Sequence, residues 1–284
     1  MVIASIKLLR PVQWIKSIFV LTGMIYSPDF TKWWPVLKTV VAFSFISSAI
    51  YIYNDMHDLE EDRAHPLKRL RPLAAGEISI KNAWIVFIIV FVLAFLIAFT
   101  VSYALIYILL SYCIINIFYN FRGKKIPWID VSCIAAGFFL RVLAGTLGVG
   151  IPLSLWLAAT ATMLSFFMAL SKRFLELKKS ITGISRMVLA KYSPVWLKFF
   201  IITTAMGCTF SYIRYITAVH LQNLPFILSV FPATLALIKF SLDVLGKRYI
   251  EDDPLLVIAE DTSIKLLLAC FGIFIIWGVI SITF

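Results

Sequence analysis

Nine apolar stretches recur along the chain, and they constrain its fold more than any other feature. Each is roughly 20 residues long, the length that an α-helix needs to cross the hydrocarbon core of a membrane. The 284 residues are 61% hydrophobic and only 14% charged, so a soluble domain could not bury the apolar surface. The stretches are continuous rather than alternating, which favours helices over a β-barrel. They cover residues 12–28, 34–54, 82–101, 103–121, 129–149, 153–172, 195–218, 224–244 and 264–283.

The predicted fold is therefore an all-α, polytopic membrane protein with nine transmembrane helices. The first stretch follows a basic N-terminus but lacks a small-x-small cleavage site, so we expect a membrane helix there rather than a cleaved signal. The sequence shows no low-complexity linker and no short repeat. We expect a single transmembrane domain over residues 1–284.

Positive charge is distributed unevenly between the connecting segments. If the N-terminus is cytoplasmic, 21 of the 26 Lys and Arg residues fall on the cytoplasmic side. Cytoplasmic loops are enriched in these residues, so the net charge of +11 does not imply binding of nucleic acid. All acidic residues except Asp29 lie in the cytoplasmic segments or at the ends of apolar stretches that face them. We therefore expect the chemistry at the cytoplasmic face of the membrane.

Few charged residues lie inside the apolar stretches. A channel or pump usually needs polar groups along a path through the membrane. Only Arg141, Arg214 and Lys239 are candidates for polar groups of such a path. A non-enzymatic membrane transporter, with the acidic segment as its cation site, is an alternative with little support from these residues.

The densest block of charge begins at Asn54, where the second apolar stretch ends. Asp55, Asp58 and Asp62 stand at i, i+3 and i+7, so on a helix they share one face. Three convergent carboxylates repel one another unless a positive charge lies among them. Mg²⁺ is commonly held by one or two carboxylates together with substrate phosphates. The spacing therefore predicts a site for Mg²⁺ and a diphosphate, with His57 outside it because hard Mg²⁺ prefers oxygen.

The segment from Asn54 to Gly76 resembles the first aspartate-rich motif of the UbiA superfamily of intramembrane prenyltransferases. Other segments resemble its decaprenyl-phosphate phosphoribosyltransferase branch. These are LRPVQWIK at 9–16, with Ser17 where the branch has Asn, the stretch 119–145, and SKRFLEL at 171–177. The resemblance covers most of the chain to about residue 180 and is looser beyond.

A second charged segment distinguishes two functions within the superfamily. Typical members carry a second acidic motif, DxxxD, after the sixth helix, whereas this chain has Lys172, Arg173 and Glu176 there. Two cations and one carboxylate suit a phosphate better than a metal. An aromatic prenyltransferase of a quinone pathway, which uses a prenyl diphosphate, is the alternative enzyme and predicts the acidic motif that is missing. A purely topological role for the two cations also stays open.

The resemblance implies a glycosyltransferase that moves 5-phosphoribose from phosphoribosyl diphosphate to a polyprenyl, decaprenyl-type phosphate for cell-envelope glycan synthesis. It implies Asp55, Asp58 and Asp62 as catalytic carboxylates, and these three with Asn54 as ligands of Mg²⁺, with Mn²⁺ as an alternative ion. The expected partners are these two substrates and the bilayer, without nucleic acid, and a homo-oligomer stays open.

The expected substrate-binding residues are cations and polar groups suited to phosphates. Some have simpler explanations, since Lys16 could extend to the headgroups and Arg141 could have a structural partner. The acidic segment from Glu251 to Asp261 fits a solvated loop, or a contact to a sugar or phosphate. The substrate-binding set is Lys16, Asn54, Lys68, Arg71, Tyr119, Lys124, Arg141, Lys172 and Arg173.

Overall fold

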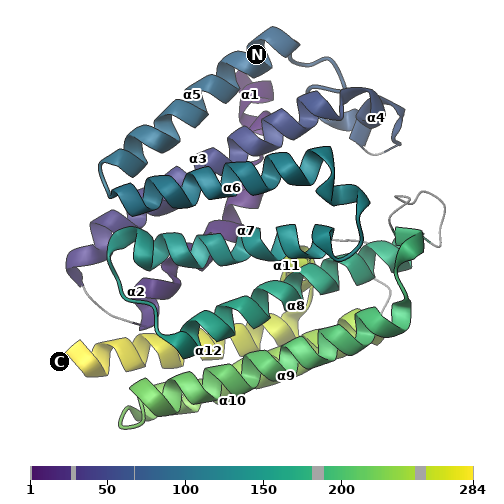
Figure 1. Ribbon diagram of the computed structural model, residues 1–284. Coiled ribbons are helices and arrows are strands. Elements are labelled where there is room, and N and C mark those ends of the chain that lie inside the picture. Colours follow the sequence, from purple (N-terminus) through teal and green to yellow (C-terminus); the bar gives the residue numbers. More distant parts are fainter. Residues whose placement is uncertain (1, 27–29, 67, 181–188, 247–253, 284) are drawn as a thin grey trace. The chain divides into compact units, whose positions relative to one another are not determined.

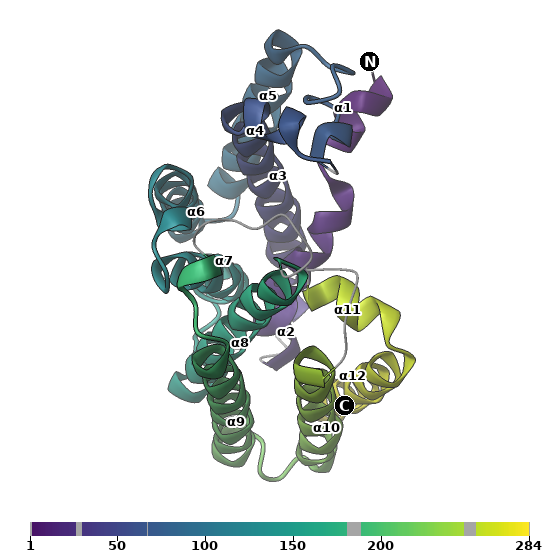
Figure 2. The same ribbon diagram turned by 90° about the vertical axis from the view of Figure 1, so that its right-hand side faces the viewer.

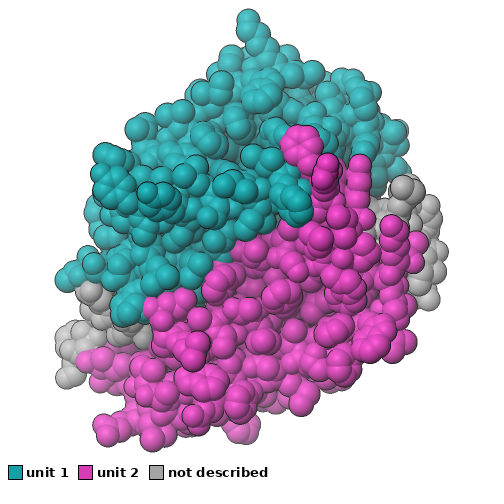
Figure 3. Space-filling view, viewed as in Figure 1, with its two compact units in different colours: residues 1–120, 140–152 teal, residues 121–139, 153–284 magenta. Residues whose placement is uncertain are grey.

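The computed structural model describes residues 2–26, 30–66, 68–180, 189–246 and 254–283, and every regular element in these ranges is a helix (Figure 1). The chain divides into two compact units, coloured separately in Figure 3. Unit 1 comprises Met1–Asn120 and Leu140–Pro152, and unit 2 comprises Phe121–Phe139 and Leu153–Phe284. The expected single domain stays a prediction.

Eight helices in the described ranges are long and apolar enough to cross a membrane. The prediction of an all-α, polytopic membrane fold is therefore confirmed for this part of the chain, and each expected stretch after the first corresponds to one of these helices. They are α3 (Trp33–His57), α5 (Ile80–Phe99), α6 (Tyr103–Phe121), α7 (Ile129–Gly145, continued by η5, Leu147–Val149), α8 (Leu155–Ser180), α9 (Pro194–Val219), α10 (Leu224–Gly246) and α12 (Thr262–Thr283).

The first apolar stretch differs from the expected single α-helix, so the count of nine is not confirmed. After the short α1 (Val2–Leu8), residues Pro11–Leu21 form a 3₁₀-helix, η1, which is followed by α2 (Thr22–Tyr26). A 3₁₀-helix rises about 2.0 Å per residue, so η1 is about 22 Å long. At about 1.5 Å per residue α2 adds roughly 7 Å. Placed end to end, these elements have a length close to that of a hydrocarbon core, about 30 Å.

Unit 1 is built around α3, which packs against α5 and η1. The face of α3 toward η1 is small and polar: Ser44 Oγ lies 2.9 Å from Ser17 Oγ, and Trp14 Nε1 donates to Ser48 Oγ at 2.9 Å. Small residues let membrane helices approach closely. These contacts fix the N-terminal segment along α3, and they carry Arg10, just before η1, to the charged end of that helix.

Unit 2 consists mainly of α8, α9, α10 and α12. Figure 2 shows α9 and α10 as antiparallel neighbours joined by a short connection, and the closest packing is between α8 and α9 and between α10 and α12. Polar side chains connect these helices, as where Tyr212 Oη lies 2.7 Å from Ser229 Oγ and Asn223 Nδ2 donates to Ser281 Oγ at 2.8 Å. The short α11 (Pro254–Glu260) precedes α12.

Candidate active site

The acidic segment is not one helix, so the expectation that Asp55, Asp58 and Asp62 share a helical face is wrong for Asp58. Helix α3 ends at His57, Asp58 has φ −96° and ψ 15°, and α4 begins at Leu59 (Leu59–Ala64). Like charges one turn apart destabilise a helix, and aspartate is a poor residue for a helix interior. The break at Asp58 relieves both effects and separates its side chain from the other two carboxylates.

Asp55 and Asp62 are buried together and bound by cations. Arg71 Nη1 lies 3.1 Å from Asp55 Oδ1 and 2.5 Å from Asp62 Oδ2, and Arg10 also pairs with Asp55 Oδ1. The Nζ atom of Lys68, in η3 (Lys68–Leu70), lies 3.8 Å from Asp62 Oδ1. The two carboxylates are only 2% exposed, so each would be costly to ionise without these partners.

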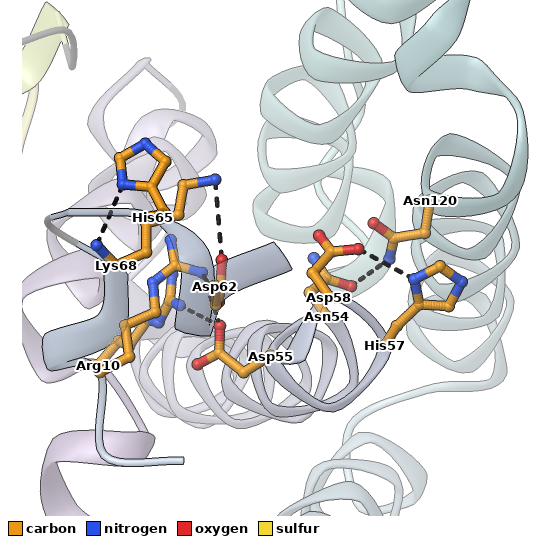
Figure 4. A network of polar contacts seen from close by, with 10 residues as sticks. Arg10, Asn54, Asp55, His57, Asp58, Asp62, His65, Lys68 and Asn120 are labelled. Atoms are coloured by element: carbon orange, nitrogen blue, oxygen red, sulfur yellow. Dashed lines mark hydrogen bonds and ion pairs between the residues drawn. The ribbon is translucent and has the colours of Figure 1, made fainter. Parts of the chain in front are cut away.

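A second cluster of polar side chains lies beside the carboxylates of Asp55 and Asp62 (Figure 4). Asn120, near the end of α6, donates from Nδ2 to Asn54 Oδ1. His57 Nδ1 lies 2.9 Å from Asp58 Oδ1. His57, which we expected to lie outside the site, therefore contacts one of its carboxylates, and the motif is divided into a cation-bound half and an amide–carboxylate half.

The donor chemistry of the motif fits a hard cation. Its groups are carboxylate and carboxamide oxygens, the ligands that Mg²⁺ prefers. Asp62 Oδ1 is a buried oxygen without a hydrogen bond among the described residues, with only the distant Lys68 ammonium beside it. As placed, no three His, Cys, Asp or Glu side chains of the described ranges form a ready metal cluster. The cations Arg10 and Arg71 neutralise the carboxylates that a metal would otherwise neutralise.

Arg10 is one of the site residues that were not predicted from the sequence. It adopts a left-handed conformation (φ 52°, ψ 60°) directly before Pro11, and its guanidinium lies 5.2 Å from the centre of the Tyr51 ring. A non-glycine residue in this region is strained, and such residues concentrate at functional sites. The sequence signal that could have identified Arg10 is its position as a lone arginine before a proline at the start of an apolar stretch.

Arg141 is buried within unit 1, at 4% exposure. Its Nη2 atom donates to Ser47 Oγ at 3.1 Å and to Tyr112 Oη at 3.4 Å. Its guanidinium also lies 4.8 Å from the centre of the Phe43 ring. These hydroxyl and aromatic contacts give Arg141 a structural setting of the kind that we considered as the alternative to substrate binding.

Arg173 lies in unit 2 and is completely buried. Its Nε atom is 2.6 Å from Asp130 Oδ2, and Nη1 pairs with Glu176. Tyr192 donates its hydroxyl hydrogen to the other oxygen of Asp130. Burial, and then this hydrogen bond, raise the pKa of Tyr192 above its ordinary value. The expected phosphate ligand therefore belongs to an internal network, of which Asp130 and Tyr192 were not predicted.

The other expected residues are half-buried: Lys16 in η1, Tyr119 in α6, Lys124 in η4 (Gly123–Lys125) and Lys172 in α8. Lys172 has no side-chain partner among the described residues, unlike Arg173 beside it.

Of the late acidic segment, Glu251–Asp253 lie outside the described residues. Asp261 caps α12, since the backbone N–H of Ile264 donates to its Oδ1 at 3.0 Å, and it pairs with Lys239 at 3.1 Å. This end of the segment has a structural role.

Comparison with known proteins identifies the family to which this chain belongs. The model of the UbiA prenyltransferase family matches residues 17–258. The chain belongs to the UbiA prenyltransferase family. It is accordingly a transferase and an integral membrane protein, and the family resemblance of its motifs is confirmed.

Two relatives and one solved structure define the similarity more closely. The chain is 34% identical over 216 residues to the decaprenyl-phosphate phosphoribosyltransferase of Corynebacterium glutamicum, covering 73% of this chain and 65% of that protein. It is 28% identical over 259 residues to the protein of the same name from Mycobacterium tuberculosis, covering 87% and 85%. The structure of a UbiA homolog from Archaeoglobus fulgidus bound to DMAPP and Mg²⁺ matches with a TM-score of 0.73 at 18% identity, over 98% of this chain and 99% of that one. This last likeness concerns the fold.

Proposed function

We propose that this protein transfers 5-phosphoribose from phosphoribosyl diphosphate to a polyprenyl phosphate. The observation that carries the proposal is the contrast between its two charged segments. In unit 1, two buried carboxylates lie among three cations. In unit 2, the corresponding segment has Lys172, Arg173 and one carboxylate, Glu176, in place of a second acidic motif, and Arg173 pairs with Glu176 and Asp130. One metal–diphosphate site suits a single sugar diphosphate, and the name of the two curated relatives, decaprenyl-phosphate phosphoribosyltransferase, supports transfer of a phosphoribosyl group.

In this proposal the oxygens of Asp55, Asp58, Asp62 and Asn54 hold the cation. The bound ion, Mg²⁺ or alternatively Mn²⁺, supplies positive charge that stabilises the leaving diphosphate. The Mg²⁺ named for the archaeal homolog supports divalent metal use.

The cations of the site have a second task, because phosphoribosyl diphosphate carries a diphosphate and a separate 5-phosphate. Arg71, Lys68 and Arg10 are already at the motif and would donate to the phosphate oxygens that replace the carboxylates as their partners. Lys16, Tyr119 and Lys124 are also proposed to bind substrate phosphates. The acceptor phosphate is ionised near neutral pH, so its oxygen can attack the sugar carbon without a strong general base.

For the second segment we propose different tasks for two adjacent residues. Lys172, which lacks a partner among the described residues, would contact a substrate phosphate. Arg173 would hold Glu176 and the start of α7 in place through Asp130. Arg141, with its hydroxyl and ring contacts, would support α3 from within unit 1 rather than reach a substrate.

We further propose that the site faces the cytoplasm from the inner membrane of a bacterial-type cell and contributes to cell-envelope glycan synthesis. The excess of Lys and Arg on the side of the motif supports this orientation.

The proposal is tested by two incubations of the purified protein with Mg²⁺. One contains phosphoribosyl diphosphate and a polyprenyl phosphate, and the other a prenyl diphosphate and an aromatic acid. We expect a lipid-linked phosphoribose from the first and no product from the second. A prenylated aromatic acid would instead assign the protein to the alternative enzyme class.

A further inference from the structure

We infer that Asn120 is a positioning residue for the metal–diphosphate site, acting through the side chain of Asn54. The inference rests on the proposed function in that Asn54 belongs to the proposed metal and substrate ligands. It adds a residue outside the acidic motif, 66 positions along the chain from Asn54.

The contact joins the charged ends of two membrane helices. Asn54 lies in the last turn of α3 and Asn120 is the penultimate residue of α6. Asn120 is 3% exposed, and its Nδ2 atom donates to Asn54 Oδ1 (Figure 4). A buried carboxamide is costly unless it is hydrogen-bonded, so this bond stabilises Asn120 in its buried position.

The direction of the bond decides which atoms Asn54 can offer to a ligand. Its carboxamide oxygen has two lone pairs, and Asn120 takes one of them. The other lone pair can bind a cation, while the NH₂ group lies on the opposite side of the carboxamide and can donate to a phosphate oxygen. Without Asn120, the Asn54 carboxamide could rotate by half a turn and place NH₂ where the oxygen was, which would repel a cation. Asn120 therefore selects the productive orientation.

The experiment measures Mn²⁺ binding to the full-length purified protein in the presence of inorganic diphosphate, by the electron paramagnetic resonance signal of free Mn²⁺. Loss of a group that orients a metal ligand typically weakens metal affinity by about 10-fold or more. We expect this loss for Asn120→Ala and no further loss when Asn120→Ala is added to Asn54→Ala. A double-mutant cycle of this kind separates action through Asn54 from an independent effect.

The chain provides a matched control. Asn116 lies one turn earlier on α6, is half-buried, and donates to the Tyr112 carbonyl of its own helix at 2.8 Å. Asn116→Ala should change the affinity by less than about twofold, within the effect of a weak local hydrogen bond. If Asn120→Ala does not fold, Asn120→Leu fills the same space without a donor, and the same comparison is made with it.

Several results would overturn the inference: unchanged Mn²⁺ affinity in the folded Asn120 variant, additive losses with Asn54→Ala, an equal loss in Asn116→Ala, or no Mn²⁺ binding by the wild type. Because Mn²⁺ binding uses no sugar or lipid, the cycle can succeed even if the two-incubation assay assigns a different donor. Failure of the inference and failure of the proposed function are therefore distinguishable.

Discussion

Replacing Arg71 by methionine tests whether this arginine neutralises the two buried carboxylates in place of a metal ion. Arg71 connects Asp55 and Asp62, whose side chains are 2% exposed, while its own side chain is 30% exposed. Methionine keeps much of the apolar stem and removes the guanidinium. Among the described residues, Asp55 then keeps its pair with Arg10, and Asp62 keeps the more distant Lys68.

The magnitude follows from the burial of these groups. Removing one partner of a buried ion pair destabilises a protein by about 3–5 kcal/mol. Because Arg10 and Lys68 remain, we expect the lower end, about 3 kcal/mol in metal-free protein. For a chain of this size that corresponds to a decrease in Tm of roughly 6–12 °C.

Thermal unfolding in detergent measures both quantities: the loss of stability with chelator present, and the stabilisation by saturating Mg²⁺. A ligand at 100 times its Kd stabilises the folded state by about 2.7 kcal/mol. In the wild type, the ion has to displace Arg71 from the carboxylates, whereas in Arg71→Met it does not. Mg²⁺ should therefore raise the Tm of the variant more than that of the wild type.

The matched control is Arg69→Met, because Arg69 lies in η3, two residues before Arg71, and is exposed. It should unfold like the wild type under both conditions. The reasoning would be refuted by an Arg71→Met protein that is as stable as the wild type in chelator, or by an equal Mg²⁺ effect on the two proteins.

Three further substitutions test other parts of the account. Asp58→Asn should abolish Mg²⁺-dependent transfer while the protein stays folded, and full activity in an assay of the purified variant would contradict the metal assignment. Lys172→Ala should raise the KM for the phosphorylated donor about 10-fold, as expected for loss of a charged hydrogen bond, with kcat little changed; an unchanged KM would return Lys172 to a topological role. Arg173→Met should destabilise the protein by about 3–5 kcal/mol because it leaves Asp130 buried without its cation, and chemical denaturation showing wild-type stability would argue against the network.

Apolar length was sufficient to predict eight of the membrane helices, because a segment of about 20 residues without water around it has to satisfy its own backbone as a helix. The first stretch differed since hydropathy does not distinguish a 3₁₀-helix from an α-helix. Arg10, left-handed before Pro11, begins a segment that side-chain contacts hold on α3, and a pattern along the chain does not contain those contacts.

In the candidate site, too, some features could be predicted from the sequence and others depend on the folded chain. The chemistry of Asp55, Asp58 and Asp62 could be read from their types and spacing, but the helix break at Asp58 depends on the balance of local repulsion and its contact with His57. The pairs Arg10–Asp55 and Asn54–Asn120 join residues 45 and 66 positions apart, and only the folded chain brings them together.

Arg173 shows how one charged residue can fit two different settings. A basic residue beside Lys172 near the end of a membrane helix suits a phosphate by composition. Its actual partner, Asp130, lies at the start of another helix and was counted only as part of the charge distribution. From sequence alone a buried ion pair and a substrate ligand look the same, because both are charged residues at a membrane boundary.

The central claim is the identity of the donor, and a competition measures it most directly. The purified protein is incubated with Mg²⁺, phosphoribosyl diphosphate, a prenyl diphosphate, a polyprenyl phosphate and an aromatic acid together, and the products are identified by mass spectrometry. The account predicts a polyprenyl phosphate that has gained one phosphoribosyl group, with release of diphosphate and dependence on Asp58. A prenylated aromatic acid, with the lipid phosphate unchanged, would contradict it.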